Sequence, residues 1–323
     1  MKNLIIYSLV LIGTLSLTSC DKWLNGQVIN YDLPEHTPVL ALYNYSISGE
    51  NVIDVRVGTS VGILTDGEPQ PVDDIAIKLY KNDVLQQSWS SEPTYTVDTL
   101  WSWTNPQTGV TEYYVDSTFS YQEPLTEPIS NEMGTKYSIE VSAPGYETIY
   151  SEGVVPSNVS ASVSISKDVP VDGREEWGQD EIGDRYSIAI NDEAGVENNY
   201  LISATGIYTS NGSKHEQRIY FNSNDPIFEY ADGGLLVSDR SFDGKSKTLE
   251  LEHWFQLQEQ RPDEVKVTIY AVAKPYMDFN ESMNKYWNSD GNPFAEPVVL
   301  YSNVENGLGL FTISNLKEID IVR

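Results

Sequence analysis

The chain is poor in the residues that most often cross-link a protein or bind a transition metal. Cys20 is the single cysteine in 323 residues, so an internal disulfide is excluded. The three histidines, His36, His215 and His253, stand far apart, and none lies at metal-ligand spacing from another. A zinc site therefore has no ligand set in this sequence.

Basic residues are also few. Lysine and arginine number 20 against 48 aspartates and glutamates, which gives a formal net charge of −28. Nucleic acid is excluded as a partner, because phosphate binding needs a basic stripe and the sequence has none. A disordered acidic chain is the alternative for this charge, but 40% hydrophobic and 11% aromatic residues predict packed cores.

Residues 1–19 have the order of an export signal. Lys2 precedes an apolar run from Leu4 to Leu17, and small residues follow the run. At about 1.5 Å per residue the run reaches about 21 Å, which is short of the roughly 30 Å hydrocarbon core of a bilayer. We therefore expect a signal peptide that is removed, rather than a spanning helix.

Cys20 follows this signal directly. We interpret it as a lipidation site, because acyl chains contribute about 0.8 kcal/mol per buried methylene and hold a protein to a membrane. The alternative is an ordinary signal peptide beside an incidental cysteine. Residues 20–36 are then a polar, lipidated tether, and Asp21 leaves the choice of leaflet open.

Apolar and polar residues alternate through most of the remaining chain, which is the period of half-buried β-strands. The clearest runs are residues 53–57, 75–79, 137–141, 186–190, 249–257 and 265–271. A short helix is predicted only at residues 276–287. The pattern therefore predicts an all-β protein. Its length suggests two domains, residues 37–156 and 184–323, joined by an acidic linker or loop at residues 157–183.

Two groups of segments resemble known families. Residues 137–146, with Val-Val-Pro at 154–156, resemble the last strands of an immunoglobulin-like or transthyretin-like module. The second group resembles Bacteroidota lipoproteins of domain-of-unknown-function family 4249, and it comprises residues 197–200, 235–239, 242–245, 292–297 and 301–311. The fold expected is thus an immunoglobulin-like or transthyretin-like sandwich followed by a larger β-sandwich with one short helix.

The family resemblance implies an outer-membrane lipoprotein, often encoded beside a TonB-dependent transporter, with no established catalytic activity. Its closing segment also has a physical interpretation. Asn306-Gly307 is a turn signal that allows positive φ, and Gly309 lets a neighbouring backbone approach closely. Asn303 and Glu296 are expected to hold loops by hydrogen bonds from side chain to backbone.

Residues 95–121 depart from what that family leads us to expect. Two strand-like runs flank residues 105–109 and predict a long aromatic hairpin. One face of each run is expected to be aromatic, and the candidate partner-binding residues are Trp101, Trp103, Tyr113 and Phe119. An exposed aromatic face favours a partner surface, since aromatic residues dominate interface cores. The alternative is an edge that covers the sandwich core.

The same hairpin contains two candidate O-glycosylation sites. Asp98-Thr99-Leu100 and Asp116-Ser117-Thr118 resemble the three-residue acceptor of exported Bacteroidota proteins, with Thr99 and Ser117 as the modified residues. Three-residue matches also arise by chance. The intact mass of the native protein distinguishes the two.

No motif in the sequence has the flanking residues that a catalytic site requires. Residues 58–62, Gly-Thr-Ser-Val-Gly, match a nucleophile elbow, but turn residues follow where that motif requires a helix. Asn288, Asp290 and Asn292 are weak candidates for calcium ligands at alternate positions, and an ordinary loop at the end of a helix is the alternative. We predict no catalytic residues, no resident metal and no cofactor.

The sequence thus predicts a lipid-anchored, non-catalytic outer-membrane protein that faces the cell exterior. It would assist a TonB-dependent transporter in ligand capture or gating, with an unknown ligand. Two other classes stay open. One is a surface hydrolase that acts on glycans or peptides, and the other is a purely structural envelope component.

Overall fold

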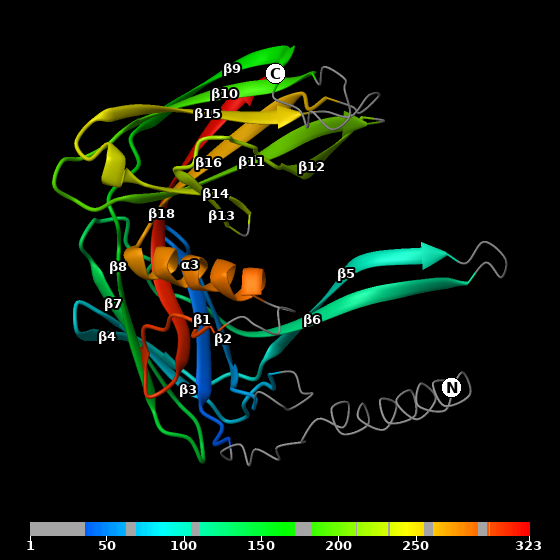
Figure 1. Cartoon of the computed structure of the whole chain (residues 1–323). Coiled ribbons are helices and arrows are strands. Elements are labelled where there is room, and N and C mark those ends of the chain that lie inside the picture. The colour runs from blue at the N-terminus through cyan, green and yellow to red at the C-terminus, as the bar shows by residue number, and fades with distance from the viewer. Residues whose placement is uncertain are drawn as a thin grey trace, which may run out of the picture. The chain divides into compact units, whose positions relative to one another are not determined.

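Strands make up most of the structure, a computed structural model (Figure 1). It describes residues 36–62, 69–104, 110–171, 182–210, 212–231, 233–254, 261–289, 296 and 298–323, with the backbone alone for residues 98–104 and 112–117. Among these residues one α-helix and one short 3-10 turn accompany the strands. The all-β prediction is therefore confirmed. Residues 38–323 form a compact unit, which is the part described below.

The first sandwich is built around the first strands of this unit. One of its sheets has the strand order β17-β8-β7-β3-β4. These strands are β17 (Val304–Glu305), β8 (Ile149–Val154), β7 (Lys136–Ser142), β3 (Ala76–Lys81) and β4 (Val84–Trp89). The facing layer is formed by β1 (Leu40–Ile47), β2 (Val52–Thr59), β6 (Thr111–Pro124) and the start of β18 (Leu308–Val322). Alternate residues of both layers point inward and bury the first core, as the period of two predicts.

The second sandwich uses the other half of the same long sheet. Its strands are β13 (Phe228–Ala231), β14 (Gly234–Ser238), β11 (Asn199–Ser210), β16 (Glu264–Val272) and the end of β18, with β12 (Ser213–Ile219) beside β11. The facing sheet has the order β15-β10-β9, with bounds Ser246–Trp254, Ile182–Asn191 and Ala161–Pro170. A separate apolar core fills the space between these two layers.

Strand β18 joins the two sandwiches, and Figure 1 shows it in red running from one to the other. Its first half pairs parallel with β1, up to Ile47↔Ser314, and its second half pairs antiparallel with β16. Phe311 accordingly lies in the first core, while Ile319 packs on the second. The second sandwich therefore does not coincide with the second domain expected at residues 184–323, since the first half of β18 belongs to the first sandwich. Residues 304–313 belong to the first sandwich, because Val304, Phe311 and Ile313 lie in its core.

The expected linker also differs from the structure. Residues 161–170 form strand β9, which pairs with β10. Val163 and Ile165 of β9 pack against the second core, so this stretch is held as an edge strand rather than left as a solvated loop. Residues 172–181 lie outside the described residues, as do residues 20–35 of the expected tether and the lipidation site Cys20.

Helix α3 (Lys274–Ser289) lies where the short helix was predicted at residues 276–287. Tyr276 and Met277 are buried on its inner side and pack with Leu310 of β18 on the outer face of the long sheet. Tyr45 of β1 also contacts this cluster, with its ring 5.1 Å from that of Tyr276. The helix therefore covers the sheet where β18 passes between the two sandwiches.

Candidate functional site

The aromatic hairpin predicted at residues 95–121 is formed by β5 (Thr94–Thr104) and β6. The two strands pair antiparallel from Thr94↔Ser120 to Thr104↔Thr111. Only residues 121–124 of β6 pair with β2, so the rest of the described ribbon has no third strand beside it. Figure 1 shows the two strands as a long ribbon. Strand β5 therefore stands at the edge of the long sheet with one side unpaired.

The hairpin does not present the single aromatic face that was expected. Thr99 pairs with Val115, but the next pair is Trp101↔Tyr114, so Leu100 is an extra residue in β5. Such a bulge shifts the alternation by one residue. Trp101 and Trp103 consequently stand out of phase with Tyr113, and the expectation of one continuous face is wrong beyond Thr99.

The base of the hairpin combines a buried and an exposed aromatic residue. Phe119 is half-buried and packs against the first core. Tyr95 lies 6.4 Å from Phe119 between ring centroids, yet it is 61% exposed, and Val97 is 62% exposed. Phe119 thus covers the core edge, as the alternative interpretation of the hairpin predicts, while the neighbouring side chains of β5 face solvent.

The other candidate residues of the hairpin are placed by backbone register only. Ser117 pairs with Val97, two pairs along the ladder from Thr99. The side chains of Trp101, Trp103 and Tyr113 lie outside the described part of the chain, as do those of the two glycosylation candidates, Thr99 and Ser117. Their roles in partner binding and modification remain predictions.

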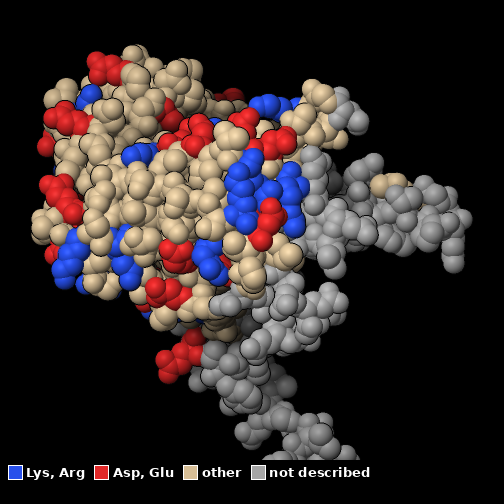
Figure 2. Space-filling view, turned by 90° about the horizontal axis from the view of Figure 1, so that it is seen from above, with Lys and Arg blue, Asp and Glu red and all other residues tan. Residues whose placement is uncertain are grey.

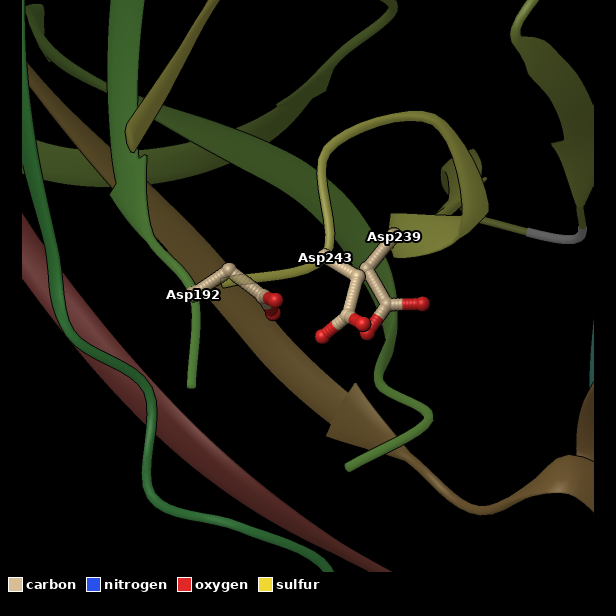
Figure 3. A group of neighbouring side chains, drawn as sticks. All are labelled: Asp192, Asp239 and Asp243. Carbon is tan, nitrogen blue, oxygen red and sulfur yellow. The ribbon is translucent and has the colours of Figure 1, made fainter. Parts of the chain in front are cut away.

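Three aspartates come together in the second sandwich, and the sequence analysis did not find this cluster (Figure 3). Asp192 follows β10, Asp239 begins the 3-10 turn η2 (Asp239–Ser241), and Asp243 follows that turn. Each offers one carboxylate oxygen within 4.8 Å of the others. Two separate loops supply these residues, so no single run of the sequence contains the cluster.

Hydrogen bonds explain why the three carboxylates meet. Asp192 accepts from the Tyr200 hydroxyl at 2.7 Å and from the backbone N–H of Gly244 at 2.9 Å. Asp243 accepts from the backbone N–H of Gly195 at 2.8 Å. Asp192 and Asp243 therefore fasten the loop after β10 to the loop after η2, and Asp239 joins them by accepting from the backbone N–H of Asn198 at 2.7 Å.

Asp239 is the most buried member, with 2% of its surface exposed. Burial raises the pKa of its carboxyl above the ordinary value, the backbone N–H of Asn198 opposes this shift, and the charges of Asp192 and Asp243 add to it. Burial also raises the pKa of Tyr200, which donates to Asp192. Carboxylate oxygens suit Ca²⁺, but the hydrogen bonds already account for this arrangement as a structural tie between loops.

The calcium candidates predicted near the end of α3 lie elsewhere. Asn288 is exposed in the last turn of the helix. Asp290 and Asn292 lie outside the described residues. The predicted ligand set is therefore described at one position only.

The serine of the elbow-like motif has a structural role. Strand β2 ends at Thr59, and the backbone N–H of Ser60 donates to Val39 O at 2.9 Å. In return, the Ser60 hydroxyl accepts from the N–H of Val39 at 3.0 Å. Ser60 thus extends the pairing of β2 with the segment before β1, so its described contacts are those of a strand end.

Charged side chains are interspersed on the face drawn in Figure 2. Ion pairs link different strands. Arg185 of β10 binds Glu252 of the neighbouring β15 at 2.6 Å, and Lys214 of β12 reaches Glu264 of β16 at 2.9 Å. Pairs that remain in contact with water contribute little, typically about 0–1 kcal/mol each. They offset part of the acidic excess without creating a continuous basic surface on the face seen.

The fold and these features define an all-β protein of two sandwiches that share one strand. The family model described as "Domain of unknown function (DUF4249)" matches residues 27–320. The chain therefore belongs to this family. No curated protein matches the chain. Among solved structures, it is similar to "Enterococcal surface protein, partial N-terminal region", at 8% identity over 75% of this chain and 92% of that one, with a TM-score of 0.17.

Within the described residues, no helix combines the length and the apolar character needed to cross a membrane.

Proposed function

We propose that this protein is a lipid-anchored, non-catalytic protein of the bacterial outer membrane that faces the exterior and assists a TonB-dependent transporter. Acyl chains on Cys20 would hold it beside its partner. Anchoring two proteins to one surface raises their effective concentration, so contacts of modest strength suffice. The partner-binding element would be the β5–β6 hairpin, through which the protein captures a ligand or gates the transporter.

The observation that carries this proposal is the unpaired edge of β5. Its described backbone pairs with β6 on one side only, and Tyr95 and Val97 beside that edge are largely exposed. An open strand edge can accept a strand from another protein, whose backbone hydrogen bonds supply affinity. Exposed aromatic and apolar side chains add the contacts that are enriched in interface cores.

The hairpin is tested by a double substitution, Trp101→Ala with Trp103→Ala. We expect co-purification of the transporter from native membranes to fall by about tenfold or more, as for aromatic hot spots in other interfaces. The melting temperature should stay nearly unchanged. The matched control is Trp287→Ala, which removes a 62% exposed tryptophan from α3. A large loss of stability in the double variant would instead place the two tryptophans in a core.

The anchor is tested separately with Cys20→Ser. This variant should leave the membrane fraction and lose labelling by a palmitate analogue, because its hydroxyl cannot accept the lipid in place of the thiol. If the variant fractionates with membranes as the wild type does, and the wild type takes up no label, the membrane part of the proposal fails. Intact mass of the native protein tests the proposed glycans on Thr99 and Ser117, since an unmodified polypeptide mass excludes them.

A further inference from the structure

A groove of about 510 Å³ lies where helix α3, the outer face of the long sheet and the base of the hairpin meet. Three aromatic residues are among those that line it. Tyr43 and Phe279 have their ring centroids 6.0 Å apart, and Phe119 of β6 is the third. The volume falls within the range of about 300–1,000 Å³ that is typical of sites for small molecules.

The floor of this groove is low because two small residues stand opposite each other. Ala41 of β1 pairs directly with Gly58 of β2, and the next pair on the same face is Tyr43↔Arg56. Directly opposed residues share a face of the sheet. A Cβ at Gly58 would lie only 3.2 Å from the ring of Phe119, so glycine lets this ring lie against the floor.

Arg56 is the single charged residue among those that line the groove. It is exposed, and no ion pair joins it to another residue in the described part of the chain. Asp54 lies two residues along the same strand and therefore on the same face of the sheet as Arg56. Its carboxylate accepts a hydrogen bond from Gln122 at 3.1 Å and forms no ion pair with Arg56 in the described part of the chain. An accessible guanidinium therefore stands beside an apolar groove in a protein whose net charge is −28.

We propose that this groove binds an amphiphilic carboxylate, with its apolar body along Phe279, Tyr43 and Phe119 and its carboxylate at Arg56. Burial of the apolar body supplies most of the affinity, at about 25 cal/mol per Å². The planar guanidinium matches a carboxylate with two hydrogen bonds and fixes the orientation. One cation suits a single negative charge, whereas a multiply charged anion would meet the repulsion of the acidic surface. This site does not depend on the transporter or on the lipid anchor.

The charge is tested by titrating the full chain carrying Cys20→Ser with decanoate and with n-decanol, which has the same chain length and no charge. We expect decanoate to bind at one site, with affinity that rises about fourfold per added methylene from octanoate to laurate until the groove is filled. Arg56→Gln should lower the affinity for decanoate by about two- to fivefold, as expected for an exposed ion pair, and should leave the affinity for decanol unchanged. The matched control is Arg218→Gln, an exposed arginine of β12, which should change neither ligand.

The apolar wall is tested with Phe279→Ala, which should weaken both ligands by about tenfold, as the loss of about 55 Å² of apolar contact predicts. Trp287→Ala on the same helix lies outside the groove and serves as its control. If Phe279→Ala lowers the melting temperature, Phe279→Leu keeps most of the wall and should weaken binding less. The proposal is overturned if neither ligand binds, if Arg56→Gln and Arg218→Gln change decanoate binding equally, or if neither wall variant reduces affinity.

Discussion

The side chain of Asn303 binds both polar backbone groups of Phe311. Its Oδ1 accepts from the N–H of Phe311 at 3.0 Å, and its Nδ2 donates to the carbonyl oxygen of Phe311 at 2.9 Å. The same Nδ2 lies 3.3 Å from the carbonyl oxygen of Glu152 in β8. One amide side chain thus connects β18 to the opposite sheet, and its bonds to backbone groups are of the kind that the sequence predicted for Asn303.

Asn303→Ala should destabilise the protein by about 1–3 kcal/mol, because the polar backbone groups of Phe311 lose their partners in a partly buried place. The midpoint of urea unfolding measures this change. Asn51→Ala, at an exposed asparagine between β1 and β2, is the matched control and should leave the midpoint within about 0.5 kcal/mol of the wild type. Equal effects of both substitutions would show that the Asn303 bonds contribute nothing to stability.

Gly309→Ala should destabilise the protein more than an ordinary glycine-to-alanine substitution at a positive φ. Gly309 has φ +117°, and a Cβ there would overlap the carbonyl oxygen of Leu42. Gly49 has φ +87° with open space around its Cα, so Gly49→Ala carries only the conformational penalty of about 1–2 kcal/mol. Thermal unfolding of the two variants separates steric overlap from backbone strain. Similar losses would contradict the close approach of β18 to β1.

Arg323→Met should destabilise the protein by about 3–5 kcal/mol, because it leaves the carboxylate of Asp184 buried without its partner. Asp184 is 0% exposed and bonds the guanidinium at 2.5 and 2.9 Å. Arg240→Met breaks an exposed pair with Glu197, 3.6 Å long, and should cost at most about 1 kcal/mol.

The double variant Asp184→Leu with Arg323→Met removes both charges and should recover much of that loss. Urea unfolding of both single variants and the double variant measures the coupling. If the effects simply add, the two residues do not act as a pair.

The stability contributed by Asp239 should depend on pH. Burial raises its pKa in the folded state, so the folded protein holds this proton at pH values where the unfolded chain has released it. The contribution is complete below the unfolded pKa and is lost as the pH rises through the folded one. Asp239→Asn cannot titrate, so its stability relative to the wild type should increase from about pH 4 to about pH 7. A difference that is constant over this range would contradict the raised pKa.

Local patterns in the sequence predicted much of the secondary structure. The period of two at residues 53–57 and 137–141 corresponds to β2 and β7, and the helix at residues 276–287 corresponds to α3. These elements are predictable because the burial of alternate residues and the ends of a helix depend on neighbours in the chain. The turn at Asn306 was also visible, and its φ of 60° agrees with the expectation.

The candidate sites were predictable only in part. The hairpin followed from its two apolar runs, but the bulge at Leu100 did not, because an extra residue is visible only when both strands are paired. The aspartate cluster and the groove at Arg56 likewise bring together residues that the sequence keeps far apart. No spacing rule connects Asp192 with Asp239, or Arg56 with Phe279.

The sequence by itself determined that this chain is a β protein with enough apolar residues for two cores and with turns at defined places, because these properties arise from each residue and its near neighbours. Tertiary structure decided which strands belong to which sandwich. Residues 308–314 lie beside β1, more than 250 positions away, because the first core needs Phe311 and Ile313 to close it. Pairing over such a distance depends on the shape of both partners, which a linear pattern does not contain.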